Sequence, residues 1–201
     1  MTDFVEQIYH NKKNYQGIIF LDRDGTVNET VAYLNKKSQL KILPTANEGI
    51  ELLNKRQIAV VIITNQPSIA RGLITINSLR EINDELVKKF NTMGLYIDAI
   101  YSCPHHPEKN HDDIPHFAMK YRVDCNCRKP KIEMFEKAMS EYGHKRILGM
   151  IGDHERDILA GKNFGIKTVF LKNSQSESKV LKIAKPDYVC DNLLDAVKAL
   201  L

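Results

Sequence analysis

Short runs of apolar residues, rich in isoleucine and valine, recur along this chain and constrain its fold more than any other feature. They cover residues 17–21, 58–63, 97–101, 147–151 and 166–171, and a shorter run covers 188–190. Runs of this length and composition predict β-strands. The runs at 17–21, 58–63 and 147–151 are apolar at nearly every position, which is typical of parallel strands that helices cover on both faces.

The segments between these runs carry apolar residues at helical spacing. Ile50, Leu52 and Leu53 share one face of a segment over 46–56, and a second segment over 76–92 shows the same pattern after Thr75. Further helices are predicted near 131–142, 155–164, 177–184 and 191–200. Because strands and helices alternate, we predict an α/β fold with a doubly wound parallel sheet.

The length of 201 residues fits a single domain. We predict that this domain covers 17–201, and that a polar leader over 1–16 precedes it as a loose helix or tail. A polar stretch at 172–178 predicts a surface loop. The long stretch between residues 103 and 127 has neither helical nor strand periodicity, so we expect a metal ion to hold it in place.

Charge and hydropathy exclude several classes of protein. The chain has 29 basic and 25 acidic residues, a net charge of +4, and the basic residues are dispersed rather than clustered as in nucleic-acid-binding proteins. Acidic residues occupy positions 3 and 6, where a signal peptide would be basic, and no apolar run reaches the ~18 residues that span a bilayer. We therefore expect a cytoplasmic monomer that binds neither nucleic acid nor membranes.

Polar side chains follow three of the predicted strands. Asp22 and Asp24 come directly after the first strand, Thr64 follows the second, and Asp153 follows the strand at 147–151. Because ligands bind at the carboxyl edge of parallel sheets, we expect these side chains to converge on one pocket. An Asp-Gly turn or a backbone cap explains one of these aspartates, but it does not explain polar groups after three separate strands.

Three of the four cysteines lie in a pattern that suits a metal. Cys103 and His105 form a Cys-x-His motif, and Cys125 and Cys127 form a Cys-x-Cys motif. Three thiolates and one imidazole complete a tetrahedral Zn²⁺ site, which is closed and structural because all four positions are filled. The alternatives are free thiols, a strained disulfide, or a different histidine ligand from His106, His111 and His116.

Four segments resemble, in chain order, the motifs of the haloacid dehalogenase-like phosphatases. They are Asp22-Arg23-Asp24-Gly25-Thr26, Thr64-Asn65, Lys129, and Gly152-Asp153 with Asp157. A narrower resemblance, carried by the motifs at 20–26, 65–72, 103–107 and 125–130, is to the branch that removes the 7-phosphate of D-glycero-D-manno-heptose 1,7-bisphosphate. The related histidinol-phosphate phosphatases share the metal loop, but Ile69-Ala70-Arg71-Gly72 favours the first branch.

The resemblance implies a Mg²⁺-dependent phosphatase, and the chemistry of these side chains fits that activity. We expect Asp22 to attack phosphorus and Asp24 to act as the acid and base. Thr64 and Lys129 would stabilise the phosphoryl oxygens. The resemblance places Mg²⁺ on Asp22, Asp153 and the backbone carbonyl of Asp24, with support from Asp157 behind them.

The expected substrate is a small sugar phosphate, and several residues are candidates to bind it. Arg128 suits an anionic group remote from the reacting phosphate. His154 occupies a position where the family usually has lysine, which weakens the contact assigned there. The other candidates are Asn65, Gln66 and Pro67, and with less support Thr30, Val31, Ala32 and Tyr33.

Two further expectations concern the lid of the site and an alternative function. The stretch over 28–40 is too short for a separate cap domain, so we expect no large cap and a lid formed mostly by the zinc-held loop over 103–127. A zinc-dependent nucleic-acid-binding module is the alternative from a different functional class. That alternative leaves the aspartates at the strand ends unexplained.

Overall fold

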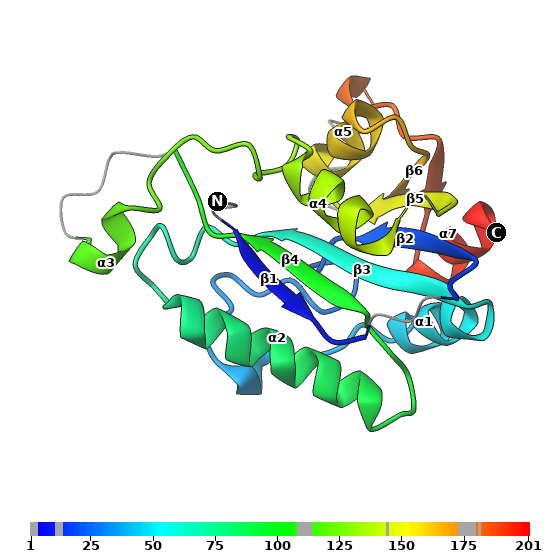
Figure 1. The fold of residues 1–201 in the computed structure, drawn as a ribbon, viewed down its shortest axis with the longest axis horizontal. Coiled ribbons are helices and arrows are strands. Elements are labelled where there is room, and N and C mark those ends of the chain that lie inside the picture. Colours follow the sequence, from blue (N-terminus) through cyan, green and yellow to red (C-terminus); the bar gives the residue numbers. More distant parts are fainter. Residues whose placement is uncertain (1–3, 11–13, 108–113, 144, 173–179, 181) are drawn as a thin grey trace.

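A computed structural model describes residues 4–10, 14–107, 114–143, 145–172, 180 and 182–201. A seven-stranded sheet forms its centre, with the strand order β1-β4-β3-β2-β5-β6-β7 (Figure 1). The strands are β1 (Val5–Ile8), β2 (Gly17–Leu21), β3 (Ile58–Asn65), β4 (Ala99–Cys103), β5 (Ile147–Gly152), β6 (Thr168–Leu171) and β7 (Tyr188–Cys190). Strands β2 to β7 are parallel, and β1 is antiparallel to β4.

Helices cover both faces of the sheet, as the continuously apolar strands require (Figure 1). Their bounds are α1 (Ala46–Lys55), α2 (Ile76–Asn91), α3 (His116–Met119), α4 (Glu133–Tyr142), α5 (Glu155–Asn163) and α7 (Leu193–Leu200). In β2, Ile19 and Leu21 pack into the apolar cluster formed with α1, α2 and α7. Ile18 and Phe20 point to the other face and pack into the cluster formed with α4. The predicted doubly wound α/β fold is confirmed.

The structure differs from the sequence prediction at the N-terminus. Residues 5–8, expected within a loose helix or tail, form the edge strand β1 and pair with β4 through backbone hydrogen bonds. Phe4 and Val5 are buried, which fixes this strand on the sheet. The predicted loop at 172–178 and helix at 177–184 lie largely outside the described residues. Within the described part of the chain, no helix combines the length and apolar character that crossing a bilayer needs.

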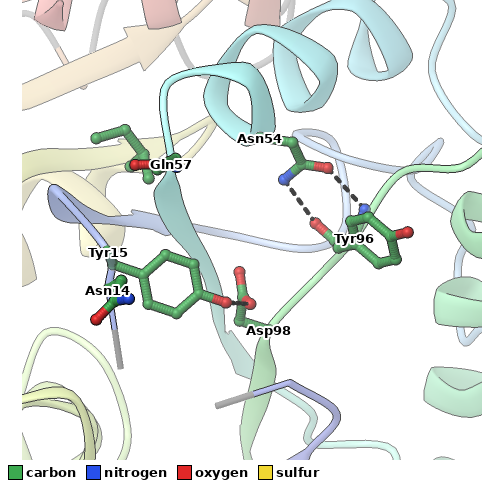
Figure 2. A pocket seen from close by; sticks show the side chains of 7 residues that line it. Asn14, Tyr15, Asn54, Gln57, Tyr96 and Asp98 are labelled. Atoms are coloured by element: carbon green, nitrogen blue, oxygen red, sulfur yellow. Dashed lines mark hydrogen bonds between the residues drawn. The ribbon is translucent and has the colours of Figure 1, made fainter. Parts of the chain in front are cut away.

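The amino edge of the sheet contains a cavity of about 270 Å³ near the start of β3 and β4. Figure 2 shows that Tyr15 binds Asp98 and that Asn54 binds Tyr96 around it. The Tyr15 hydroxyl donates to Asp98, whose other carboxylate oxygen accepts the Val60 N–H at 2.7 Å. Asn54 exchanges two hydrogen bonds with the backbone of Tyr96. These contacts brace the start of the two strands at the edge opposite to the predicted site.

The insertions at the carboxyl edge of the sheet determine what surrounds that site. The segment between β2 and α1, residues 22–45, holds a single 3-10 turn at Lys37–Gln39 and no separate domain. The segment between β4 and α4 carries the cysteine motifs and α3.

Candidate active site

Three adjacent strands bring the predicted residues together. The sheet order places β3, β2 and β5 side by side, so the groups after these strands share one edge. Asp22 and Thr64 are buried there. Carboxylate oxygens of Asp22, Asp153 and Asp157 all lie within 4.8 Å of one another. The expected convergence of the carboxylates therefore occurs in the structure.

Two glycines allow these loops to approach so closely. Gly25 has φ of +82°, and a Cβ atom there would collide with the carboxylate of Asp153. A Cβ atom on Gly152 would likewise collide with the side chain of Asp157. The turn after β2 also requires the left-handed backbone that glycine adopts without strain. A side chain at either glycine would push the carboxylates apart.

Lys129 lies at the centre of the carboxylate group. Its ammonium donates to Asp22 Oδ1 at 2.9 Å and to the Ile63 carbonyl at 2.6 Å, and it lies 2.7 Å from Asp157 Oδ1. Burial opposes its charge, but the carboxylates of Asp157 and Asp22 outweigh this effect and hold the pKa of Lys129 above its ordinary value. Lys129 is therefore a fixed, buried cation in contact with the predicted nucleophile.

Asn65 holds Lys129 in this place. Its Oδ1 accepts the backbone N–H of Lys129 and its Nδ2 donates to the backbone carbonyl of the same residue, both at 3.0 Å. The amide is thus engaged at both ends by Lys129. Asn65, a candidate for orienting substrate, thus also positions the catalytic candidate Lys129.

Asp24 is held by three neighbouring side chains. The Arg23 guanidinium contacts both of its carboxylate oxygens at 2.9–3.1 Å. Asn28 donates to Oδ1 at 2.9 Å and Gln66 donates to Oδ2 at 2.8 Å. Burial alone would raise the pKa of Asp24, but the charge and hydrogen bonds of Arg23 outweigh it and lower the pKa. Gln66 also donates to Thr64 Oγ1, so one amide links two catalytic candidates.

The acidic residues have the properties of a Mg²⁺ site. Burial, and then the charge of Asp157, raises the pKa of Asp22. Burial and the charge of Asp22 raise the pKa of Asp153 to about 8. Such shifts mark negative charge that the neighbouring cations do not fully offset. Carboxylate oxygens are the ligands that Mg²⁺ prefers, so Asp22 and Asp153 fit that ion.

Asp157 completes the acidic group from the first turn of α5. Besides its ion pair with Lys129, its Oδ2 accepts the backbone N–H of His154 at 3.0 Å. This geometry agrees with the predicted supporting role. His154 itself begins α5 as its N-cap residue.

The four predicted zinc ligands form a single cluster. The sulfur atoms of Cys103, Cys125 and Cys127 are 3.1–3.6 Å apart, and His105 Nδ1 lies 3.3 Å from Cys127 Sγ and 3.7 Å from Cys103 Sγ. A tetrahedral site with Zn–S bonds of about 2.3 Å would separate its sulfurs by about 3.8 Å. The donor set and the close grouping therefore fit a Zn²⁺ ion.

The alternatives to this ligand set have less support. All four cysteines are free in the structure, so no disulfide joins the cluster. Among the described residues, neither His106 nor the exposed His116 belongs to the cluster. His111 lies outside the described residues. The contact with Cys103, together with burial, raises the pKa of Cys125, and a cation between the thiols would offset that effect.

The predicted substrate-binding residues lie in several different places around the site. Arg128 follows the last cysteine and donates to the backbone carbonyl of His105 at 3.0 Å, which ties it to the metal cluster. Thr30 and Asp153 line one cavity of about 450 Å³. Tyr33 is half exposed, and the guanidinium of Arg71 lies 5.6 Å from its ring centroid.

The remaining three candidates have no contact that assigns them to the site. Val31 is partly buried and packs against the main apolar cluster. Ala32 is exposed and Pro67 is half-buried.

Sequence reasoning assigned no role in the site to Arg156, or to Arg71 beyond its place in the motif at 69–72. Burial lowers the pKa of Arg128, and the positive charges of Arg156 and Arg71 lower it further. Burial raises the pKa of Asp153, and the charge of Arg156 opposes that rise. A signal for Arg156 was present in the sequence, because a cation in the first turn of a helix opposes the helix dipole.

The chain is similar over most of its length to phosphatases of known sequence and structure. A family model described as HAD-hydrolase-like matches residues 126–196. The D-glycero-beta-D-manno-heptose-1,7-bisphosphate 7-phosphatase of Pasteurella multocida is 32% identical over 182 residues, 90% of this chain and 94% of that protein. The D-glycero-D-manno-heptose-1,7-bisphosphate 7-phosphatase of Chlorobaculum tepidum is 29% identical over 189 residues, 90% and 92% of the two chains.

A solved structure shows the same fold. The crystal structure of the D,D-heptose 1,7-bisphosphate phosphatase from B. bronchiseptica, complexed with magnesium and phosphate, superposes with a TM-score of 0.75 at 28% identity. The match covers 91% of this chain and 97% of that chain.

The cysteine cluster predicts the metal content of the purified protein. We expect about one zinc ion per chain by elemental analysis, because the four donors complete a tetrahedral site. Cys125→Ser should lose the ion, whereas Cys190→Ser, which alters the cysteine outside the cluster, should keep it. A zinc-free wild-type protein whose four thiols all react freely would rule out this site.

The pKa of Asp153 predicts how Mg²⁺ binding depends on pH. Since this pKa is about 8 and its ordinary value is 3.8, the folded protein holds a proton that the unfolded chain releases. This group therefore lowers the free energy of unfolding as pH rises from about 4 to about 8. Mg²⁺ must displace the proton, so its apparent affinity should rise about tenfold per pH unit between pH 6 and 8.

The measurement is the increase in Tm that Mg²⁺ produces at pH 6 and at pH 8. Asp153→Asn, which removes the carboxylate, is the control and should show a small increase at both pH values. Equal Mg²⁺ affinity of the wild-type protein at pH 6 and pH 8 would contradict the role assigned to Asp153.

Proposed function

This chain belongs to the haloacid dehalogenase-like hydrolases and is a phosphoric monoester hydrolase, and we propose that it removes the 7-phosphate of D-glycero-D-manno-heptose 1,7-bisphosphate. The proposed reaction depends on Mg²⁺ and passes through a phosphoryl group on Asp22. The observation that carries the proposal is the buried Asp22 carboxylate, held by Lys129 at the edge of the sheet. We place the reaction in the synthesis of a nucleotide-heptose precursor for a cell-envelope polysaccharide.

In the first step, the Asp22 carboxylate attacks phosphorus and the bond between phosphorus and the ester oxygen breaks. Lys129 binds Oδ1 of Asp22, which leaves Oδ2 as the attacking atom. The departing alkoxide takes its proton from Asp24, which must hold that proton once substrate is bound, although its contacts with Arg23, Asn28 and Gln66 in the free protein favour the ionised form. When bound, Mg²⁺ offsets the repulsion between the carboxylate and the phosphate dianion.

In the second step, a water molecule attacks the phosphoryl group on Asp22. Asp24, now ionised, accepts a proton from this water, and the bond between phosphorus and the Asp22 oxygen breaks to release phosphate. Thr64 and Lys129 donate to the phosphoryl oxygens in both steps. The contacts of Asp24 with Arg23 and Gln66 favour the ionised form that this second step needs.

A bisphosphate substrate fits the positive charge beside the reacting group. Arg128 is fixed by the carbonyl of His105, and Arg71 and Arg156 lie near enough to influence its pKa. Guanidinium groups bind phosphate through paired hydrogen bonds. The heptose 1,7-bisphosphate carries a second phosphate remote from the reacting one, whereas histidinol phosphate does not. The arginines therefore favour the bisphosphate.

A phosphate-release assay with Mg²⁺ and a panel of heptose, hexose and histidinol phosphates tests the substrate. We expect the highest kcat/KM with D-glycero-D-manno-heptose 1,7-bisphosphate. Asp22→Asn should reduce turnover of every substrate by more than about a hundredfold, because an amide cannot form the phosphorylated intermediate. Retention of activity by a folded Asp22→Asn protein would refute the assignment of the nucleophile, and a higher kcat/KM with histidinol phosphate would refute the substrate.

Arg128 provides a separate test of specificity. Arg128→Ala should lower kcat/KM for the bisphosphate by about 10- to 1000-fold, since a charge-assisted contact to the remote phosphate is lost. A small aryl phosphate has no such group, so its kcat/KM should fall much less. Lys129→Ala is the comparison and should damage both reactions. If Arg128→Ala reduces both reactions equally, the residue serves the chemistry or the fold instead.

A further inference from the structure

A buried arginine lies directly behind Asp24. Arg23 is among the largest fully buried side chains, with 1% of its surface exposed. Its Nε and Nη2 groups donate to the Asp24 carboxylate, and its Nη1 group donates to Asn83 Oδ1 at 2.9 Å. Arg23 thus connects the acid and base candidate to a residue sixty positions away on α2.

Asn83 continues these contacts to the N-terminal strand. It is fully buried on the inner face of α2, whose neighbouring inward positions are leucine and isoleucine. Its Nδ2 donates to Gln7 Oε1 at 2.9 Å, and it lies 3.3 Å from Ser102 Oγ on β4. Gln7 in turn donates to Asp84 Oδ1 at 2.8 Å. Continuous hydrogen bonds therefore lead from β1 through α2 to Asp24.

The fold alone does not require this set of polar groups. Burying a guanidinium costs free energy that its partners must offset, and a buried ion pair is often no more stabilising than apolar residues of the same volume. The other buried residues of α2 are all apolar. The pair of Arg23 and Asn83 instead fixes the geometry of Asp24, because Arg23 holds both carboxylate oxygens in a single orientation.

We propose that Arg23 and Asn83 are positioning residues that set the orientation of the Asp24 carboxyl group, and that β1 contributes through Gln7. This inference rests on the proposed role of Asp24 as the acid that protonates the leaving group. Asn83 fixes the guanidinium from behind, and the guanidinium fixes the carboxyl group. Residues of the N-terminal segment, expected to be a loose leader, thereby become part of the support of the active site.

A misplaced Asp24 carboxyl group affects substrates with poor leaving groups most, whereas a general loss of folding affects all substrates alike. Phenyl phosphate and 4-nitrophenyl phosphate have nearly the same shape, but phenolate is a much poorer leaving group than 4-nitrophenolate. Cleavage of phenyl phosphate therefore depends more on a well-placed acid. Because kcat/KM covers only the steps up to loss of the leaving group, it reports the placement of Asp24 without the later attack of water.

The test compares kcat/KM for the two aryl phosphates in several variants of the full chain with Mg²⁺. Asn83→Leu removes the acceptor for Arg23 and should lower kcat/KM about 10- to 100-fold for phenyl phosphate but less than about threefold for 4-nitrophenyl phosphate. Asn83→Asp keeps the acceptor for Arg23 but loses the donation to Gln7, so its loss should be no larger than that of Gln7→Leu. Gln7→Leu should show the preference of Asn83→Leu with a smaller loss.

Two controls separate placement from folding. Leu86→Ala removes a buried side chain one turn further along α2 without touching the hydrogen bonds, so it should lower Tm and leave the ratio of the two kcat/KM values unchanged. Arg23→Lys keeps the charge but loses the paired contact with Asp24. It should lower kcat/KM for phenyl phosphate more than for 4-nitrophenyl phosphate, and it replaces Asn83→Leu in the test if Asn83→Leu fails to fold.

Asp24→Asn tests the role of Asp24 as acid, whereas Asn83→Leu and Arg23→Lys test the positioning of Asp24. Asp24→Asn should itself discriminate between the two aryl phosphates, and equal losses there would refute the role of Asp24 as acid. If Asp24→Asn discriminates but Asn83→Leu and Arg23→Lys reduce both reactions equally, the positioning role is wrong and the hydrogen bonds serve only the fold.

Discussion

The rest of the site depends on the contacts of the Lys129 ammonium group with the carboxylates of Asp22 and Asp157. The ammonium group lies between Asp22 and Asp157 and also donates to the carbonyl of Ile63. A buried cation persists only where carboxylates and carbonyls replace its water, and buried carboxylates likewise need a cation. These mutual requirements join the ends of β2 and β3, the first turn of α5 and the segment after the cysteine cluster at one point.

The cysteine cluster explains how a loop residue occupies such a demanding position. Cys127 precedes Lys129 by two residues, and Asn65 binds the backbone of Lys129 from β3. A zinc ion on the cluster would therefore fix the chain on one side of Lys129, while β3 fixes the other. The two metal sites have different tasks in this account. Zinc would hold the loop, whereas Mg²⁺ would act among carboxylates whose burial and mutual repulsion raise the pKa values of Asp22 and Asp153.

The sequence predicts the features that depend on local pattern and on motif order. Strand positions follow from apolar runs, and the convergence of Asp22 with Asp153 follows from the geometry of parallel sheets. Strand β1 escaped prediction because an edge strand of four residues gains its stability from pairing with β4, which its own mixed composition does not reveal. The contact between Arg23 and Asn83 joins residues far apart in sequence, and no local pattern indicates such a pair.

The central claim is that the carboxylate of Asp22, held by Lys129, becomes phosphorylated during turnover. The most direct measurement is to quench the enzyme in acid during turnover of the heptose bisphosphate, reduce the protein with borohydride and sequence its peptides by mass spectrometry. Reduction converts an aspartyl phosphate to homoserine, so we expect homoserine at position 22 only when substrate and Mg²⁺ are both present. Homoserine at position 24, or an unmodified Asp22 in enzyme quenched during rapid turnover, would contradict it.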